Sequence, residues 1–133
     1  MFAALMRGES AIRPVFPELA KPAVAALAAF DASRWFTKLQ LAGVDRVSQL
    51  AVAAADLAVK DAGGHEGIDP SRLGVYVGCG MGGTASLDAA YHAAFQNGGR
   101  VPPLTIPALM ANAPAGHVAI RQVARGPVLT YSV

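Results

Sequence analysis

A glycine-rich run is the part of the sequence whose residue types and spacing could do chemistry. It comprises Gly78, Cys79, Gly80, Met81, Gly82 and Gly83, and it contains the only cysteine of the chain. Its form satisfies G-x-G-x-x-G, which can place a pyrophosphate at a helix N-terminus. Alternatively, Cys79 could be a nucleophile on a strand-to-helix elbow, where backbone N–H groups favour a thiolate and bind an oxyanion. Thirdly, the glycines could let the backbone pass close to another element, with Cys79 as a small buried apolar residue.

The surrounding residues favour the third interpretation. A dinucleotide site expects an acidic residue about 20 positions further on, to bind the ribose hydroxyls. After Asp88 the sequence contains no Asp or Glu. An elbow needs glycine two residues to either side of its nucleophile, and here those positions hold Val77 and Met81. The residues alone therefore indicate a close backbone approach rather than a nucleotide site or a catalytic cysteine.

The three histidines do not indicate a metal or a cofactor. His65, His92 and His117 show neither the i, i+4 spacing nor the cysteine partners of a zinc site, and none has a diagnostic spacing from Cys79. We expect no metal and no cofactor. A single cysteine cannot form a disulfide within the chain, which predicts a reducing, cytoplasmic location.

The elements that position the glycine-rich run follow from hydrophobic spacing. Apolar residues recur at helical spacing after Val44, with Asp45 as the N-cap and Gly63 and Gly64 as the stop. Residues 73–77 are typical of a buried strand. We further expect helices over 86–96, 107–112 and 114–123, a strand over 128–133, the end of a helix over 1–6, and loop over 8–36 with one short helix in the alanine-rich residues 23–30. The order helix, strand, helix, helix, strand predicts an α/β layer architecture.

Composition limits the classes of function. The chain has 133 residues, of which 53% are hydrophobic and 15% charged, so it is not typical of a disordered protein. Its net charge of +2 comes from scattered residues, which argues against a nucleic-acid partner. No stretch reaches the ~18 uninterrupted apolar residues of a membrane span, so no membrane insertion is expected. The abundance of small apolar residues predicts helix contacts within the chain or against further protein surface.

Several landmarks, taken in chain order, resemble one family. They are Gly8-Glu9-Ser10-Ala11-Ile12, Phe30-Asp31, Val44-Asp45-Arg46, Leu73-Gly74-Val75-Tyr76-Val77-Gly78, Gly80-Met81-Gly82-Gly83, Ile106-Pro107, Ala115-Gly116-His117 and Arg125-Gly126-Pro127. Together they resemble the β-ketoacyl-acyl-carrier-protein synthases of the elongating type, members of the thiolase superfamily. The resemblance covers essentially the whole chain. It implies a thiolase-like α/β fold with two duplicated halves, of which residues 1–133 are most of the first, N-terminal half.

The resemblance also implies an acyltransferase activity in fatty acid or polyketide synthesis. Such enzymes condense an acyl thioester with malonyl-carrier protein in a decarboxylative Claisen reaction. Aligned on Gly126-Pro127, the family's acyl-accepting cysteine falls two positions after Val133, within an Ala-Cys pair. The two histidines that promote decarboxylation lie far downstream, and the first strand precedes Met1. We therefore expect no catalytic residue within the chain, and no activity of these residues on their own.

Substrate and partner residues are implied in the same way. Thr105, Leu109 and Met110 are expected to border the acyl pocket, partly across a dimer interface in which the strand over 128–133 pairs about the two-fold axis. Ordinary helix packing is an equal alternative for Leu109 and Met110. The implied partners are an acyl carrier protein and either a second copy of the chain or a ketosynthase-like second subunit.

Two positions depart from the family pattern. Members that bind a free carrier protein often have Arg or Lys just before the Asp that opens the helix, whereas this chain has Leu39, Ala42 and Gly43. Val123 stands where a glycine is common, so we expect the helix end there to differ in detail. Two alternatives to a catalytic parent therefore remain: a noncatalytic partner subunit of the chain-length-factor type, and a truncated chain with no independent function.

Overall fold

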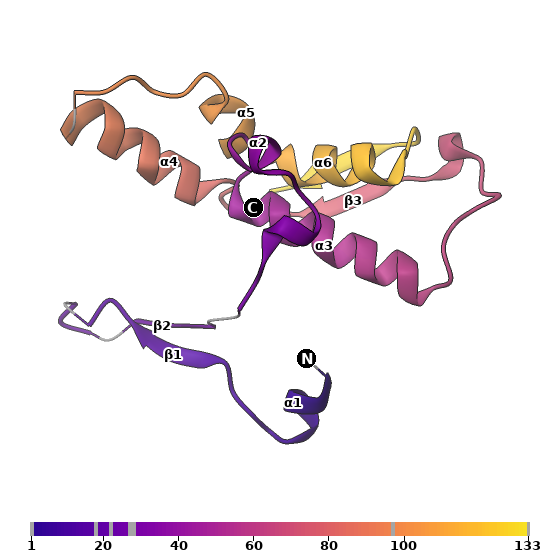
Figure 1. The fold of residues 1–133 in the computed structure, drawn as a ribbon, viewed down its shortest axis with the longest axis horizontal. Helices are drawn as coiled ribbons and strands as arrows, with labels where there is room; N and C mark the ends of the chain where they lie inside the picture. Colours follow the sequence, from indigo (N-terminus) through magenta and orange to yellow (C-terminus); the bar gives the residue numbers. More distant parts are fainter. Residues whose placement is uncertain (1, 18, 22, 27–28, 97, 133) are drawn as a thin grey trace. The chain divides into compact units, whose positions relative to one another are not determined.

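The computed structural model describes residues 2–17, 19–21, 23–26, 29–96 and 98–132. The chain divides into two compact units, Met1–Asp31 and Ala32–Val133. The first contains helix α1 (Phe2–Met6) and the strands β1 (Ile12–Val15) and β2 (Ala23–Ala26). The second contains all the remaining helices and strands described below (Figure 1).

The first unit is built on a hairpin that the sequence did not predict. Strand β1 pairs antiparallel with β2, so that Ile12 lies opposite Ala26 and Val15 opposite Ala23. The short helix expected over 23–30 is therefore wrong for residues 23–26, while Leu27 and Ala28 lie outside the described residues. Alanine prefers helix, but the backbone hydrogen bonds offered by β1 override that weak preference. Helix α1 confirms the helix expected over 1–6 for residues 2–6, and Met1 lies outside the described residues.

The second unit places two helices against a parallel pair of strands. Helix α3 spans Arg46–Asp61, helix α6 spans Ala113–Gln122, strand β3 spans Val75–Gly78 and strand β4 spans Val128–Tyr131. The two strands run parallel, with Val75 opposite Val128. Figure 1 shows α3 and α6 beside the strands. The core between them consists of the buried residues Val52, Val75, Ala115, Val118 and Ala119. This arrangement confirms the predicted α/β class and the predicted elements at these positions, although β4 ends at Tyr131 rather than at Val133, which lies outside the described residues.

Shorter elements connect this core. They are η1 (Ala32–Arg34), α2 (Lys38–Leu41), η2 (Pro70–Arg72), α4 (Thr84–Tyr91), the π-helical η3 (His92–Gln96) and α5 (Thr105–Leu109). Helix α4 with η3 confirms the helix expected over 86–96, two residues longer at its start. The short helix expected over 107–112 begins and ends earlier, so Pro107 is the third residue of α5 rather than its first.

The glycine-rich turn between β3 and α4 makes the close backbone approach that its composition predicted. A Cβ atom added at Gly83 would lie 2.5 Å from the carbonyl oxygen of Ala108 and 2.8 Å from the Cα atom of Leu109. Only glycine fits there without displacing α5. Cys79, expected to be buried, is half-buried.

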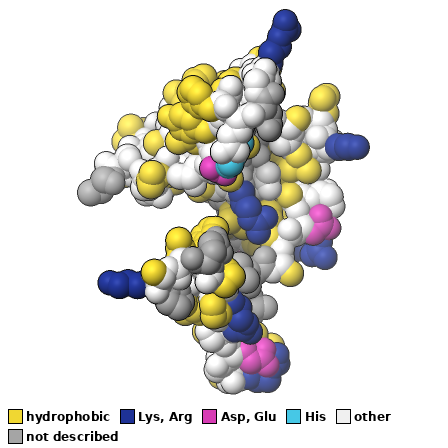
Figure 2. Space-filling view, turned by 90° about the vertical axis from the view of Figure 1, so that its left-hand side faces the viewer, with side chains coloured by type: hydrophobic (Ala, Val, Ile, Leu, Met, Phe, Trp, Pro, Cys, Tyr) yellow, Lys and Arg dark blue, Asp and Glu magenta, His cyan; other side chains and the backbone are white. Residues whose placement is uncertain are grey.

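One face of the parallel strand pair is open. Tyr76, Leu129 and Tyr131 are 60%, 46% and 59% exposed, on the side of the pair opposite Val75. The space-filling view in Figure 2 likewise shows hydrophobic side chains uncovered at the surface.

Among the described residues, no helix has both the length and the apolar character needed to cross a membrane.

Candidate functional site

The carboxyl ends of β3 and β4 meet at the glycine-rich turn. The backbone N–H of Cys79 donates a hydrogen bond to the carbonyl oxygen of Tyr131 at 2.9 Å, and the hydroxyl of Ser132 donates to the carbonyl oxygen of Gly80 at 2.9 Å. Ligands of parallel α/β sheets bind outside the carboxyl ends of the strands. The turn and the end of β4 are therefore the part of the fold best placed for a site.

The described residues give Cys79 no catalytic partner. No histidine or carboxylate among them is hydrogen-bonded to its thiol. His65 contacts Gln122, and His92 contacts Gln96 and Asp88 within its own helix. No group of three or more potential metal ligands occurs in the part of the chain that the structure describes.

His117 is the third histidine, and it lies half-buried on α6. Burial lowers the pKa of its imidazole, because desolvation disfavours the charged form. It borders an apolar hollow of about 330 Å³ that is also lined by Phe36, Leu39 and Leu104. A neutral imidazole in such a setting is suited to packing rather than to ion pairing.

The three residues expected at the acyl pocket lie in or just after α5. Thr105 is only 9% exposed and borders a hollow of about 220 Å³ whose opposite wall is formed by alanines of α4 and η3. Leu109 is half-buried, and its carbonyl oxygen accepts a hydrogen bond from the backbone N–H of Gly83 at 3.2 Å. Met110 is 45% exposed. The structure thus brings Thr105 and Leu109 together on a short helix that packs on the glycine-rich turn.

Asp45 holds a role that sequence reasoning missed. Its carboxylate caps α3, as predicted, with Oδ1 accepting from the backbone N–H of Val47 at 3.0 Å. It also reaches α4, where Oδ2 accepts from the backbone N–H of Ser86 at 2.8 Å and from the Ser86 hydroxyl at 2.6 Å. The residue is buried, at 5% exposure. No local pattern signals this second contact, because 41 residues separate the partners.

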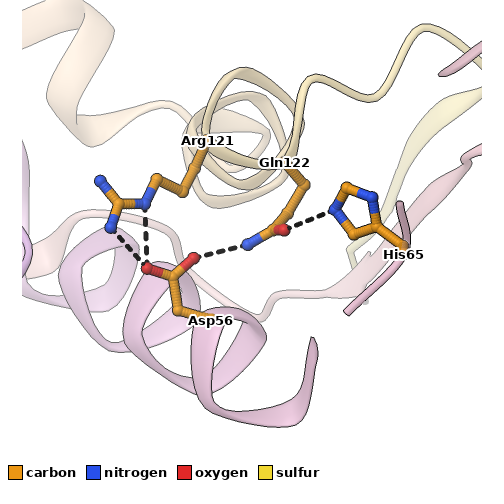
Figure 3. A network of polar contacts seen from close by, with 4 residues as sticks. All are labelled: Asp56, His65, Arg121 and Gln122. Carbon is orange, nitrogen blue, oxygen red and sulfur yellow. Dashed lines mark hydrogen bonds and ion pairs between the residues drawn. The ribbon is translucent and has the colours of Figure 1, made fainter. Parts of the chain in front are cut away.

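A second polar network joins α3 to α6 (Figure 3). The Asp56 carboxylate accepts from Arg121 at 2.9 and 2.7 Å and from the side-chain amide of Gln122 at 2.5 Å. The amide oxygen of Gln122 then accepts from Nε2 of His65 at 3.0 Å, which assigns the proton to that nitrogen. Each of these four side chains is hydrogen-bonded within the network, so the network is suited to holding α3 against α6 rather than to catalysis.

An apolar hollow of about 520 Å³ lies between α3 and β3. Alanines of α3 and the residues from Leu73 to Gly78 form most of its lining, and no Asp, Glu, Lys or Arg contributes. It is suited to an apolar occupant, and the one histidine in its lining, His65, is hydrogen-bonded to Gln122.

Comparison with known proteins relates this geometry to a family. The sequence model of the family described as "Beta-ketoacyl synthase, N-terminal domain" matches residues 4–132. A 3-oxoacyl-[acyl-carrier-protein] synthase 2 of Rhizobium meliloti (strain 1021) is 37% identical over 101 residues, 74% of this chain and 24% of that protein. The chain spans about a quarter of the length of such curated relatives.

Solved structures share the fold. The ishigamide ketosynthase/chain length factor superposes with a TM-score of 0.77 at 23% identity, covering 98% of this chain and 34% of the other. The AntDE:AntF complex, in which a type II PKS acyl-carrier protein is bound to its ketosynthase, gives a TM-score of 0.62 at 22% identity and covers 79% and 30%. The fold is therefore the thiolase-like α/β fold of ketosynthases. The chain belongs to the β-ketoacyl synthase family and corresponds to its N-terminal domain.

Proposed function

We propose that the chain is the N-terminal part of a ketosynthase that condenses an acyl thioester with malonyl-carrier protein, in fatty acid or polyketide synthesis. The family match over residues 4–132 is the observation that carries this proposal. In the proposed reaction, a cysteine thiolate attacks the acyl thioester and releases the carrier thiol. The malonyl group then loses CO₂, and the resulting enolate attacks the enzyme-bound thioester, forming the β-ketoacyl product and freeing the thiolate.

The local geometry supports a location for this reaction at the end of β4, beside the glycine-rich turn. Strand β4 ends beside the glycine-rich turn, and the resemblance puts the acyl-accepting cysteine two positions after Val133. Thr105 and Leu109 lie on the helix that contacts the same turn, through the hydrogen bond from Gly83 to Leu109. We propose that Thr105, Leu109 and Met110 border the acyl chain, and that Cys79 takes no covalent part.

An activity assay on the natural protein that contains this sequence tests the proposal. Incubation with an acyl-carrier thioester and malonyl-carrier protein is expected to yield a β-ketoacyl-carrier product and CO₂, both measurable by mass spectrometry. A Cys79→Ser variant serves as the matched control and is expected to form product at the wild-type rate. Absence of condensation in the wild type, or its loss in Cys79→Ser alone, contradicts the proposal.

A noncatalytic partner subunit is the second candidate, and one observation favours it. Leu39 occupies a position where carrier-binding members often have a basic residue, and it is 85% exposed on α2. A leucine offers no positive charge for an ion pair with a carrier protein. In this case the chain would form a heterodimer with a catalytic ketosynthase rather than a homodimer, and the residue two positions after Val133 would not be cysteine. Reading the gene beyond that codon distinguishes the two candidates.

A further inference from the structure

One buried carboxylate serves the N-termini of two helices. Asp45 Oδ1 accepts from Val47 in the first turn of α3, and Oδ2 accepts from the backbone N–H and the hydroxyl of Ser86 in the first turn of α4. A buried carboxylate is retained only where hydrogen bonds replace its lost water, and these three contacts do so. The two helices therefore depend on the same side chain.

Helix α4 has no cap of its own. Its N-cap residue is Gly83, which has no side chain to bind the first free N–H groups of the helix. Asp45 supplies the missing acceptor from another element. The position of the first turn of α4 is thus set by α3, through Asp45.

The same carboxylate also touches the residue that packs on α5. A Cβ atom added at Gly83 would lie 3.0 Å from Cγ of Asp45, 2.5 Å from the carbonyl oxygen of Ala108 and 2.8 Å from Cα of Leu109. Gly83 is therefore enclosed between the carboxylate and α5, and its N–H donates to the carbonyl oxygen of Leu109. If the start of α4 moved away from Asp45, Gly83 would lose its close packing against α5 and its hydrogen bond to the carbonyl oxygen of Leu109.

We infer that Asp45 is a positioning residue that fixes the spacing of α4 and α5 by capping α4 from α3. The hollow of about 220 Å³ between those helices is lined by Ser86 on one side and by Thr105 and Ala108 on the other. Its width then follows from the Asp45–Ser86 contact. The consequence for an acyl substrate rests on the proposed function, in which Thr105 and Leu109 border the acyl chain.

An Asp45→Ser variant separates the two caps. Serine is a good N-cap for its own helix, so α3 keeps an acceptor, whereas the shorter side chain no longer reaches Ser86. Asp69→Ser is the matched control, because Asp69 accepts from the backbone N–H of Ser71 at 2.9 Å in an exposed turn and serves no second helix. Ser86→Ala is a milder variant that removes only the hydroxyl contact.

Hydrogen exchange of backbone amides measures the result on the natural protein that contains this sequence. In Asp45→Ser, the amides of Leu87 and Ala108 are expected to exchange about tenfold faster, while those of Val52 and Val118 in the core keep the wild-type rate. Asp69→Ser is expected to change neither pair. Unchanged exchange at Leu87 and Ala108 in Asp45→Ser overturns the inference. If Asp45→Ser also loses protection at Val52 and Val118, the Ser86→Ala variant is the deciding test. In Ser86→Ala, the amides of Leu87 and Ala108 are expected to exchange faster than in the wild type, by a smaller factor than in Asp45→Ser. Unchanged exchange at these two amides in Ser86→Ala overturns the inference.

A second measurement separates positioning from the proposed function. Octanoyl-pantetheine is expected to slow exchange in α5 of the wild type, and Asp45→Ser is expected to need a higher concentration for the same effect, while Asp69→Ser does not. Equal concentration dependence in Asp45→Ser and the wild type overturns the consequence for the acyl chain. If the thioester protects nothing in the wild type but Asp45→Ser still accelerates α5 exchange, the proposed acyl contact is wrong and the positioning role is supported.

Discussion

At the scale of a single residue, the surroundings of Cys79 decide whether its thiol can act as a nucleophile. The thiol lies half-buried in the glycine-rich turn, and no histidine or carboxylate among the described residues is bonded to it. A nucleophilic cysteine needs a paired base or another means of stabilising its thiolate. The position next to the ends of two parallel strands is therefore not sufficient to make Cys79 reactive.

We accordingly predict that Cys79 forms no acyl adduct. Incubation of the chain with an acyl-carrier thioester, followed by intact-protein mass spectrometry, is expected to leave the protein mass unchanged. Iodoacetamide labelling in urea serves as the control, because it establishes that the thiol is present and free. A stoichiometric acyl group located on Cys79 by peptide mapping would contradict this prediction.

Val123 is a residue whose backbone conformation opposes its side chain. It ends α6 as the C-cap with φ of 55° and ψ of 30°, the left-handed conformation that usually belongs to glycine at this place. The sequence suggested that the helix end would differ where valine replaces glycine. In this chain the backbone takes a glycine-like conformation at Val123, and the β-branched side chain carries the strain.

Replacing Val123 by glycine is therefore expected to stabilise the end of α6. The side chain of Val123 is 57% exposed, so its removal loses few contacts and the relief of backbone strain is the larger effect. After subtracting the extra conformational entropy that glycine has in the unfolded chain, we expect the free energy of unfolding to rise by about 1 kcal/mol. Amide exchange in the last turn of α6 should slow by roughly fivefold. Val101→Gly is the control, since Val101 is also exposed but has no positive φ. Faster exchange in Val123→Gly would show that the valine is not strained.

At the scale of an element, α3 shows what a sequence pattern can and cannot predict. The start at Asp45 and the stop before Gly63 were correct, because caps and glycines are local signals. The buried side was not determined by spacing alone. Leu50 and Leu57 fit an apolar stripe but are 44% and 58% exposed, whereas Val52 is 1% exposed. Which face is buried depends on where α6 and β3 lie, and the helix's own residues do not contain that information.

The glycine-rich turn and α5 allow a direct test of element packing. Gly83→Ala places a Cβ atom against two backbone groups of α5, which cannot move as a flexible side chain could, and is expected to cost more than about 2 kcal/mol. Gly116→Ala is the matched control, because its Cβ meets nothing within 4 Å in α6 and should stabilise that helix by about 0.5–1 kcal/mol. Denaturant midpoints of the two variants, measured in the natural protein that contains this sequence, are expected to move in opposite directions. A midpoint for Gly83→Ala at or above the wild-type value would exclude the tight contact.

At the scale of the whole molecule, the α/β class followed from the order of elements. The 16-residue helix α3 was long enough to show its period, and the short strands β3 and β4 were marked by β-branched apolar runs next to glycines. The β1–β2 hairpin could not be predicted in this way, because its alanine-rich second strand is defined only by pairing with β1. The contact of Asp45 with Ser86 and the network of Asp56 with Arg121 and Gln122 could not be predicted for the same reason. These contacts join residues that are far apart in the sequence, and local sequence patterns do not predict them.

The uncovered apolar surface leads to a prediction for the chain as a whole. The parallel sheet has only two strands among the described residues, and such a pair is marginally stable without further cover. Tyr76 and Tyr131 leave one face open, and many other large apolar side chains are exposed, among them Leu39 at 85%, Phe95 at 78% and Ile120 at 79%. Figure 2 shows hydrophobic side chains exposed on the face of the molecule that it draws. We therefore expect the isolated chain to bind the dye ANS, to show weak near-UV circular dichroism despite helical far-UV signal, and to unfold over a broad range of urea concentration. Lysozyme at equal concentration is the control for a closed core. A monodisperse monomer that binds no dye and unfolds in one sharp transition would mean that these faces are covered within the chain itself.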